Sequence, residues 1–191
     1  PQLASTATDS QKSSNDEFKN GLMFSKAGQP EAGPLKNIFF VGSSDDRIKR
    51  IIALRDGLFI FKTDGVFVLR GQDESSFSVQ PLDLTAKIIS SDSIEVVNNM
   101  IYGLFDAGVC EVSDSGVSVV SIPIKEQFEE LMSDTLTNLE TYGFGVSDQV
   151  NGKYILALPE NDQSTSCTQQ FIFDTNGKTW VKWDLDILCG R

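Results

Sequence analysis

The sequence contains no histidine among its 191 residues. Histidine is the usual general base of nucleophilic triads and the commonest metal ligand in proteins. Its absence excludes Ser-His-Asp and Cys-His nucleophile systems and leaves paired carboxylates as the remaining acid–base machinery. Because the acidic pairs of this chain also match no reaction site or calcium loop closely, we expect no catalytic residue, no cofactor site and no metal site.

Cysteine is also scarce, with Cys110, Cys167 and Cys189 at long spacings and no CxxC pair. A structural zinc site needs such paired ligands, so none is indicated, and one disulfide is permitted without being suggested. Cys110 lies in the apolar run GVCEV, where a thiol usually acts as a small buried hydrophobic group.

Long apolar runs and an excess of basic residues are missing too. No apolar run approaches the roughly 18 residues of a membrane span, and no signal peptide is recognisable, so we predict no membrane insertion. The 27 acidic residues outnumber the 16 basic ones, giving a net charge of −11. Nucleic acids and anionic membranes attract clustered Lys and Arg, so specific binding to either is not expected. The acids are spread through loops, which is typical of a soluble surface.

The chain is rich in short apolar segments separated by turn signals. Residues 51–71, IIALRDGLFIFKTDGVFVLRG, carry apolar segments on both sides of Asp64-Gly65. An Asp-Gly pair favours a tight turn between antiparallel strands, because glycine has no Cβ to clash at positive φ. Neighbouring residues such as Ile60 and Phe61 point to opposite faces of a strand. Both faces are therefore apolar, and a sheet of such strands must be covered on both sides.

This pattern occurs three times. The predicted strands of the first unit are Ile48–Leu54, Leu58–Lys62, Val66–Arg70 and Phe77–Leu82; those of the second are Ile94–Val97, Met100–Phe105, Val109–Val112 and Val117–Ile122; those of the third are Tyr142–Val146, Tyr154–Leu158, Gln170–Phe173 and Thr179–Trp183. The units begin about 46–48 residues apart, near the repeat length of propeller blades. We predict an all-β fold of three four-stranded antiparallel blade-like sheets, a partial β-propeller, since closed propellers have roughly four to eight blades.

Two segments fall outside the repeats. The segment KEQFEELM, residues 125–132, places Phe128, Leu131 and Met132 on one face and predicts one short helix. Residues 1–20 are mostly polar without periodicity, which predicts a flexible or extended N-terminal segment ahead of a propeller-like domain at 21–191. Neither end resembles a natural boundary, so we expect a fragment of a longer protein.

Several acidic motifs resemble reaction sites only weakly. The neighbouring carboxylates Asp45-Asp46 and the pair Asp184 and Asp186 lie in predicted loops, where adjacent acids are common by chance. The segment DTNGKT, residues 174–179, shares only part of a calcium-loop pattern and is interpreted as a hairpin turn. The segment GSSDD, residues 42–46, lacks the spacing and the lysine of a phosphate-binding loop.

Trp180 and Trp183 are the residues that we select as candidate contacts with a partner protein or a glycan. They are three positions apart in a predicted strand, so their side chains point to opposite faces. We expect one tryptophan in the core and the other at a sheet edge or stacked on a sugar.

The order of several short phrases resembles a known family. The sequence reads GLMFSKAGQPEAG, NIFFVGSSDDRIKRIIALRDGLFIFKTDGVFVLRG, MIYGLFDAGVCEVSDSGVSVVSIPIKEQFEEL, KYILALP and QQFIFDTNGKTWVKW in that order. The matching positions of its first two phrases are Ser25, Gly28, Pro30, Glu31, Val41, Gly42, Ser43, Asp45 and Ile48. Over about residues 21–183 the chain resembles structural tail proteins of tailed bacteriophages, especially the propeller-like nozzle or tail-hub proteins of short-tailed phages.

The resemblance implies a virion structural component of the phage tail without catalysis. Family members form ring-like homo-oligomers, often six-fold, around the DNA channel, contact other tail or portal-side proteins, and help to control genome ejection. An acidic channel wall would repel the DNA backbone and let the genome slide. Two other functions remain open: a receptor- or carbohydrate-binding β module, favoured by an exposed tryptophan beside carboxylates, and a hydrolase with a carboxylate pair.

Overall fold

The computed structural model describes residues 18–34, 36–73, 75–134 and 136–185. These residues form 14 strands in four antiparallel sheets, together with two α-helices and two short 3-10 helices. The strands are β1 (Gly21–Met23), β2 (Ile38–Phe40), β3 (Ile48–Leu54), β4 (Gly57–Lys62), β5 (Gly65–Arg70), β6 (Ser78–Asp83), β7 (Glu95–Val97), β8 (Met100–Phe105), β9 (Gly108–Ser113), β10 (Gly116–Val119), β11 (Phe144–Asp148), β12 (Lys153–Leu158), β13 (Gln169–Asp174) and β14 (Thr179–Trp183).

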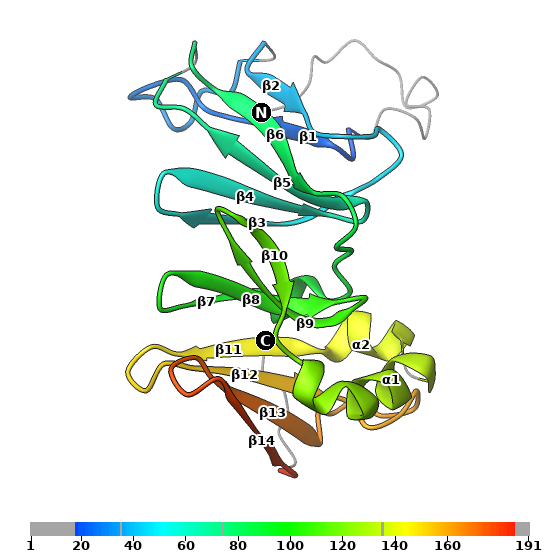
Figure 1. The fold of residues 1–191 in the computed structure, drawn as a ribbon. Helices are drawn as coiled ribbons and strands as arrows, with labels where there is room; N and C mark the ends of the chain where they lie inside the picture. The colour runs from blue at the N-terminus through cyan, green and yellow to red at the C-terminus, as the bar shows by residue number, and fades with distance from the viewer. Residues whose placement is uncertain (1–17, 35, 74, 135, 186–191) are drawn as a thin grey trace, which may run out of the picture.

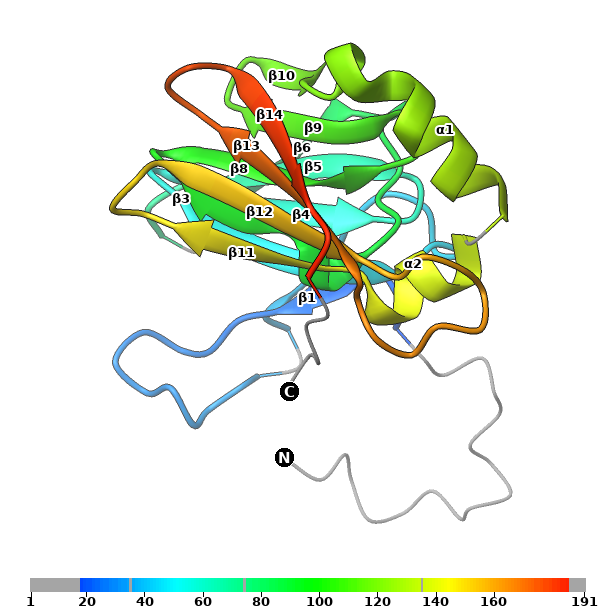
Figure 2. The same ribbon diagram turned by 90° about the horizontal axis from the view of Figure 1, so that it is seen from below.

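The sheets are stacked in the order in which they occur along the chain (Figure 1). The two-stranded sheet β1–β2 lies at one end, followed by β3–β6, β7–β10 and β11–β14, each of the last three being a meander of sequential strands. The helices α1 (Lys125–Asp134) and α2 (Leu136–Tyr142) lie beside the last two sheets, on one side of the stack (Figure 2).

The mostly β architecture and all twelve strands of the three predicted units are confirmed, with ends shifted by a few residues. The count of three sheets is wrong, because the apolar pieces near residues 22 and 39 pair into a fourth sheet, with Leu22 opposite Phe39. The predicted helix is α1, and a second helix, α2, follows it. The expected turn at Asp64-Gly65 lies one residue earlier, since Gly65 pairs with Lys62 and already belongs to β5.

Apolar residues cover both faces of the two inner sheets, as the alternation of Ile60 and Phe61 predicted. Between β3–β6 and β7–β10, the buried side chains include Phe59, Phe61, Ile101 and Phe105. A second core lies between β7–β10, β11–β14 and the helices, and it contains the residues Tyr102, Leu104, Phe128, Leu139, Tyr154, Leu156, Phe171 and Phe173. A smaller core, centred on Ile60 and Phe67, lies between β3–β6 and β1–β2.

Residues 1–17 of the predicted N-terminal segment lie outside the described residues. Residues 18–20 are attached to the fold, since the Gly21 amide donates to the Phe18 carbonyl and the Ile48 amide to the Lys19 carbonyl. The buried Asn20 donates through its side chain to the Gly42 carbonyl at 3.3 Å. This turn therefore begins the folded part of the described chain.

Buried hydrogen bonds hold β11–β14 against the sheet before it. Ser93, in the 3-10 helix Ser91–Ser93, accepts a 2.8 Å bond from the Tyr154 hydroxyl at its carbonyl and a 2.9 Å bond from the Leu104 amide at Oγ. Ser90 donates to the Gly143 carbonyl at 2.5 Å. Because these serines are fully buried, leaving any of their partners unpaired would cost stability.

A second bridge between the same two sheets is ionic. Glu111 on β9 accepts a 2.7 Å bond from the Tyr102 hydroxyl and pairs at 2.9 Å with Lys178 in the β13–β14 turn. Partial burial by itself raises the pKa of Glu111, but the hydrogen bonds from Lys178 and Tyr102 outweigh it, so the pKa lies below its ordinary value. Burial and the same carboxylate raise the pKa of Tyr102.

Replacing Gly145 by alanine should test the close approach of β11 to the 3-10 helix Ser91–Ser93. A Cβ on Gly145 would overlap the Ser93 carbonyl oxygen and lie 3.0 Å from the Tyr154 ring. We expect Gly145→Ala to lower the free energy of unfolding by about 1–3 kcal/mol in urea denaturation. Gly177→Ala is the matched control, because its Cβ would meet nothing closer than 3.5 Å. Equal stability of both variants would contradict the tight packing.

The Glu111 bridge predicts a pH-dependent stability. Since the native pKa lies below the ordinary value near 4.5, the bridge stabilises the fold above that pH and is lost as pH falls through the native pKa. Glu111→Gln should therefore be less stable than wild type at pH 7, with the difference shrinking toward pH 3, as measured by urea midpoints. Glu129→Gln, which disrupts an exposed pair with Lys125, should change little at either pH.

Candidate functional site

The structure places the two tryptophans on opposite faces of β14. Trp180 packs into the core against Phe173, with ring centroids 4.8 Å apart, and its Nε1 donates to the Val120 carbonyl at 3.0 Å. Trp183 lies on the opposite face, away from β7–β10, with 49% of its surface exposed. Trp180 is partly buried, so Trp183 is the more accessible of the two candidates.

Trp183 belongs to an apolar surface, which we call the outer face of β11–β14. The strand register aligns two rows of side chains across this face. One row consists of Val146, Ile155, Ile172 and Val181, and the other of Phe144, Ala157, Gln170 and Trp183. Val146 and Val181, at the two ends of the first row, are 44% and 52% exposed. The middle of the face is buried, since Ile172, Ala157 and Gln170 are 4%, 1% and 0% exposed. The exposed apolar surface therefore lies on the two edge strands, β11 and β14, against which no described element of the chain lies.

Gln170 fixes the chain where it leaves β14. Its side chain donates to the Leu185 carbonyl at 2.6 Å and accepts from the Leu185 amide at 3.0 Å. These paired bonds satisfy a fully buried amide and hold Leu185 beside Trp183. Leu185 is itself half exposed and extends the apolar surface of the outer face.

Acidic side chains lie at the turn end of the outer face. Asp148 and Asp174 both close turns: Asp148 accepts from the Asn151 side chain at 2.7 Å, and Asp174 accepts from the backbone amides of Asn176 and Gly177. These hydrogen bonds lower the pKa of both carboxyls, and the positive charge of Lys153 between the two strands adds to the effect. Asp174 thus shapes the hairpin that was predicted for DTNGKT.

The remaining sequence candidates do not converge on one place. Asp46 accepts a 2.8 Å bond from the Thr63 hydroxyl and so ties the 42–46 loop to the β4–β5 turn. Asp184 is exposed and pairs with Lys182 at 3.5 Å, while Asp186 lies outside the described residues. Cys110 is buried, and burial raises the pKa of its thiol to about 12, so that it stays protonated.

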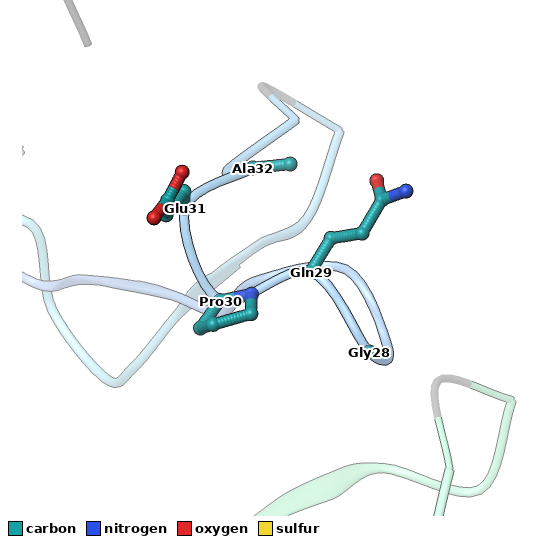
Figure 3. Close-up of a pocket in the computed structure, with 5 residues that line it drawn as sticks. All are labelled: Gly28, Gln29, Pro30, Glu31 and Ala32. Carbon is teal, nitrogen blue, oxygen red and sulfur yellow. The ribbon is translucent and has the colours of Figure 1, made fainter.

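A hollow in the loop between β1 and β2 is lined by Gly28, Gln29, Pro30, Glu31 and Ala32 (Figure 3). All five residues belong to one exposed turn, with Gln29 and Glu31 pointing in different directions. Gly28 has a φ of 71°, which allows this tight turn. The hollow brings together no side chains from separate elements, so its chemistry is that of an exposed loop.

Sequence reasoning missed a buried lysine. Lys62 at the end of β4 is fully buried, with Nζ 3.1 Å from Asp64 Oδ1, 3.0 Å from the Ser43 carbonyl oxygen and 5.4 Å from the centre of the Phe67 ring. The sequence feature that could have indicated this burial is a lysine at the end of an apolar strand, two positions before Asp64. Lys62 holds the 42–46 loop against the sheet, which is a structural role.

Comparisons with known proteins give no guide to function, since no protein-family model matches the chain and a search of curated proteins finds no similar sequence. Within the described ranges, no cluster of three or more metal-ligating side chains is present. None of the helices there is long and apolar enough to cross a membrane.

Replacing Lys62 by methionine should leave the Asp64 carboxylate without its cation in a largely buried site. We expect Lys62→Met to lower the free energy of unfolding by about 3 kcal/mol, measured by chemical denaturation. Lys125→Met, at an exposed ion pair, should cost under about 1 kcal/mol. In Lys62→Met/Asp64→Asn the loss should be smaller than in Lys62→Met alone; additive losses would argue against the coupling.

Proposed function

We propose that this chain is a structural component of a bacteriophage tail that works by assembly and not by catalysis. The observation that carries the proposal is the outer face of β11–β14, whose register continues the apolar rows found between the other sheets. An apolar sheet face of this kind is stabilised when a neighbouring protein surface covers it. The three stacked meanders have four strands each, as the blades of a propeller do, and this supports the resemblance to nozzle and tail-hub proteins.

In this proposal the three four-stranded sheets are blades of a propeller. Each is an antiparallel meander packed face to face on the next, which is how propeller blades bury two apolar faces. The β1–β2 sheet then represents part of a further blade. Three blades and a part do not close a ring of four to eight, so other chains or further segments would complete it.

The proposed partners are copies of the same chain, arranged in a ring, and other tail or portal-side proteins of the virion. The net charge of −11 favours passage of DNA without specific binding, because an acidic surface repels phosphates. The location that follows is the tail of the phage particle.

The proposal can be tested by looking for the protein in phage particles. A host is infected with the phage that carries this gene, and production of the protein in the infected cells is measured. The virions are then purified through a density gradient and analysed by quantitative mass spectrometry. We expect peptides of this chain in the virion, in a fixed ratio to the portal protein set by the tail symmetry. Production in infected cells with absence from purified virions would overturn the proposal.

A receptor- or carbohydrate-binding module is the second candidate, favoured by the half-exposed indole of Trp183 next to the exposed Asp184. Indole faces stack on sugars, and carboxylates accept hydrogen bonds from sugar hydroxyls. If this candidate is right, a glycan array should show binding that is lost in Trp183→Ala and kept in Val150→Ala, which removes an exposed side chain from a turn. Absence of glycan binding by the wild-type chain would remove it.

A further inference from the structure

The stack has two ends that differ in shape and charge. At one end lies the outer face of β11–β14, four strands wide. At the other end lies β1–β2, whose Leu22 points into the core with β3–β6 while Met23 and Phe40 point away from it. Phe18, Met23 and Phe40 are 62%, 48% and 57% exposed, and the rings of Phe18 and Phe40 lie 5.8 Å apart. We call these three residues the β1–β2 end patch.

We propose that the outer face of β11–β14 of one copy packs on the β1–β2 end patch of a second copy, in a head-to-tail contact. This inference rests on the proposed assembly role and names the surfaces that would carry it. A contact between unlike surfaces is heterologous, so it builds a closed ring if the rotation per copy allows closure and a longer chain of copies if it does not.

The pattern of side chains favours a sheet as the occupant. The row formed by Val146, Ile155, Ile172 and Val181 crosses all four strands, as the apolar rows between the stacked sheets do. Apolar rows of this type pack well against a second sheet about 10 Å away. A second copy supplies such a sheet in β1–β2, with exposed aromatic and methionine side chains directed away from its own stack.

The charges of the two ends favour a head-to-tail contact over a symmetric one. Residues 18–42, which include β1 and β2, carry three lysines and one glutamate, although the whole chain has a net charge of −11. Residues 144–185, which include β11–β14, carry five acidic residues and three lysines. The loop that follows β2 adds Asp45 and Asp46, which makes residues 18–46 neutral. Two outer faces packed together would bring two acidic ends into contact, whereas a head-to-tail contact sets an acidic end against a neutral one.

The width of the sheets also distinguishes the ends. The two strands of β1–β2 cover only part of the four-stranded β3–β6 sheet, since Ile51, which shares a face with the buried Ile60, is 45% exposed. The neighbouring copy would therefore meet a narrower sheet with apolar surface beside it. The exposed side chains of the outer face, Val146, Val181 and Trp183, lie on its two edge strands, so the face can contact the end patch with one edge and this uncovered part with the other.

The test uses the full chain and one substitution at each end. Val181→Asp places a charge on the outer face, and Phe40→Asp places one in the end patch. Ile122→Asp is the control, because Ile122 is 68% exposed and belongs to neither surface. Molar mass is measured by light scattering after size exclusion and by sedimentation velocity over a range of concentrations, with circular dichroism and thermal melts confirming that each variant folds.

We expect wild type and Ile122→Asp to associate in a concentration-dependent way. Val181→Asp and Phe40→Asp should each weaken association at least about tenfold, because an unpaired carboxylate would be buried. An equimolar mixture of the two variants should form a 1:1 dimer, because the intact end patch of one meets the intact outer face of the other. Val146→Asp should reproduce Val181→Asp if the latter folds poorly.

Three outcomes would overturn the head-to-tail contact: a monomeric wild type at every concentration, association that depends on Val181 but not on Phe40, and a mixture of the two variants that stays monomeric. The second outcome would indicate a symmetric pairing of outer faces. These measurements are independent of the virion experiment. A monomer found in virions would leave the proposed function standing, and association without incorporation would leave the contact standing.

Discussion

The fold depends on burying both faces of the β7–β10 sheet. In β8, Ile101 and Phe105 belong to the core shared with β3–β6, while Tyr102 and Leu104 belong to the core shared with β11–β14. Neighbouring side chains of one strand therefore stabilise two different interfaces, and neither face can be exposed without loss of a large apolar area. Because this sheet needs a neighbour on each side, the stack cannot be divided into independently stable sheets.

Polar contacts place the sheets relative to one another within this apolar stack. The carbonyl and hydroxyl of Ser93 bond to Tyr154 in one sheet and to the Leu104 amide in another, and Gly145 provides the space for that approach. At the rim of the stack, Asp114 in the β9–β10 turn pairs with Arg70 at 2.9 Å and Arg55 at 3.6 Å. Apolar faces alone allow two sheets to slide, whereas buried bonds at fixed positions select one arrangement.

The sequence predicted most of the strands because hairpins are local. Two-residue turns are followed by a glycine at positive φ in three hairpins, namely at Gly65, Gly108 and Gly116, with φ values of 145°, 111° and 137°. At Gly65 a Cβ would lie 2.6 Å from the Asp83 carbonyl oxygen, so this glycine is required by packing as well as by φ. Turn chemistry and alternation together fix the register of each meander within a few residues.

What the sequence did not predict depends on contacts between distant segments. β1 and β2 are three residues each and are separated by a long loop, so their pairing has no local turn signal. Helix α2 contributes the buried Leu139 to a core formed by strands on both sides of it in the sequence. The exposure of Trp183 and the burial of Trp180 follow from strand alternation, but which of the two faces inward depends on where β7–β10 lies.

The two ends of the stack expose apolar side chains because the strands carry apolar residues on both faces, which is also what stabilises the sheets in the middle. A stack in which every sheet is apolar on both sides has no natural terminal sheet, so each end needs a smaller sheet, a polar face or a neighbour. Here β1–β2 reduces one end to two strands, and β11–β14 keeps four strands with Val146, Val181 and Trp183 about half exposed. Helices α1 and α2 lie at the side of the stack and not over that outer face (Figure 2), whose exposed apolar side chains are those of its edge strands. The residues that stabilise the interior and those that would contact a partner thus occupy alternate positions of the same strands. A substitution at one position changes the packing on one face of the sheet, and a substitution at the next position changes the packing on the opposite face.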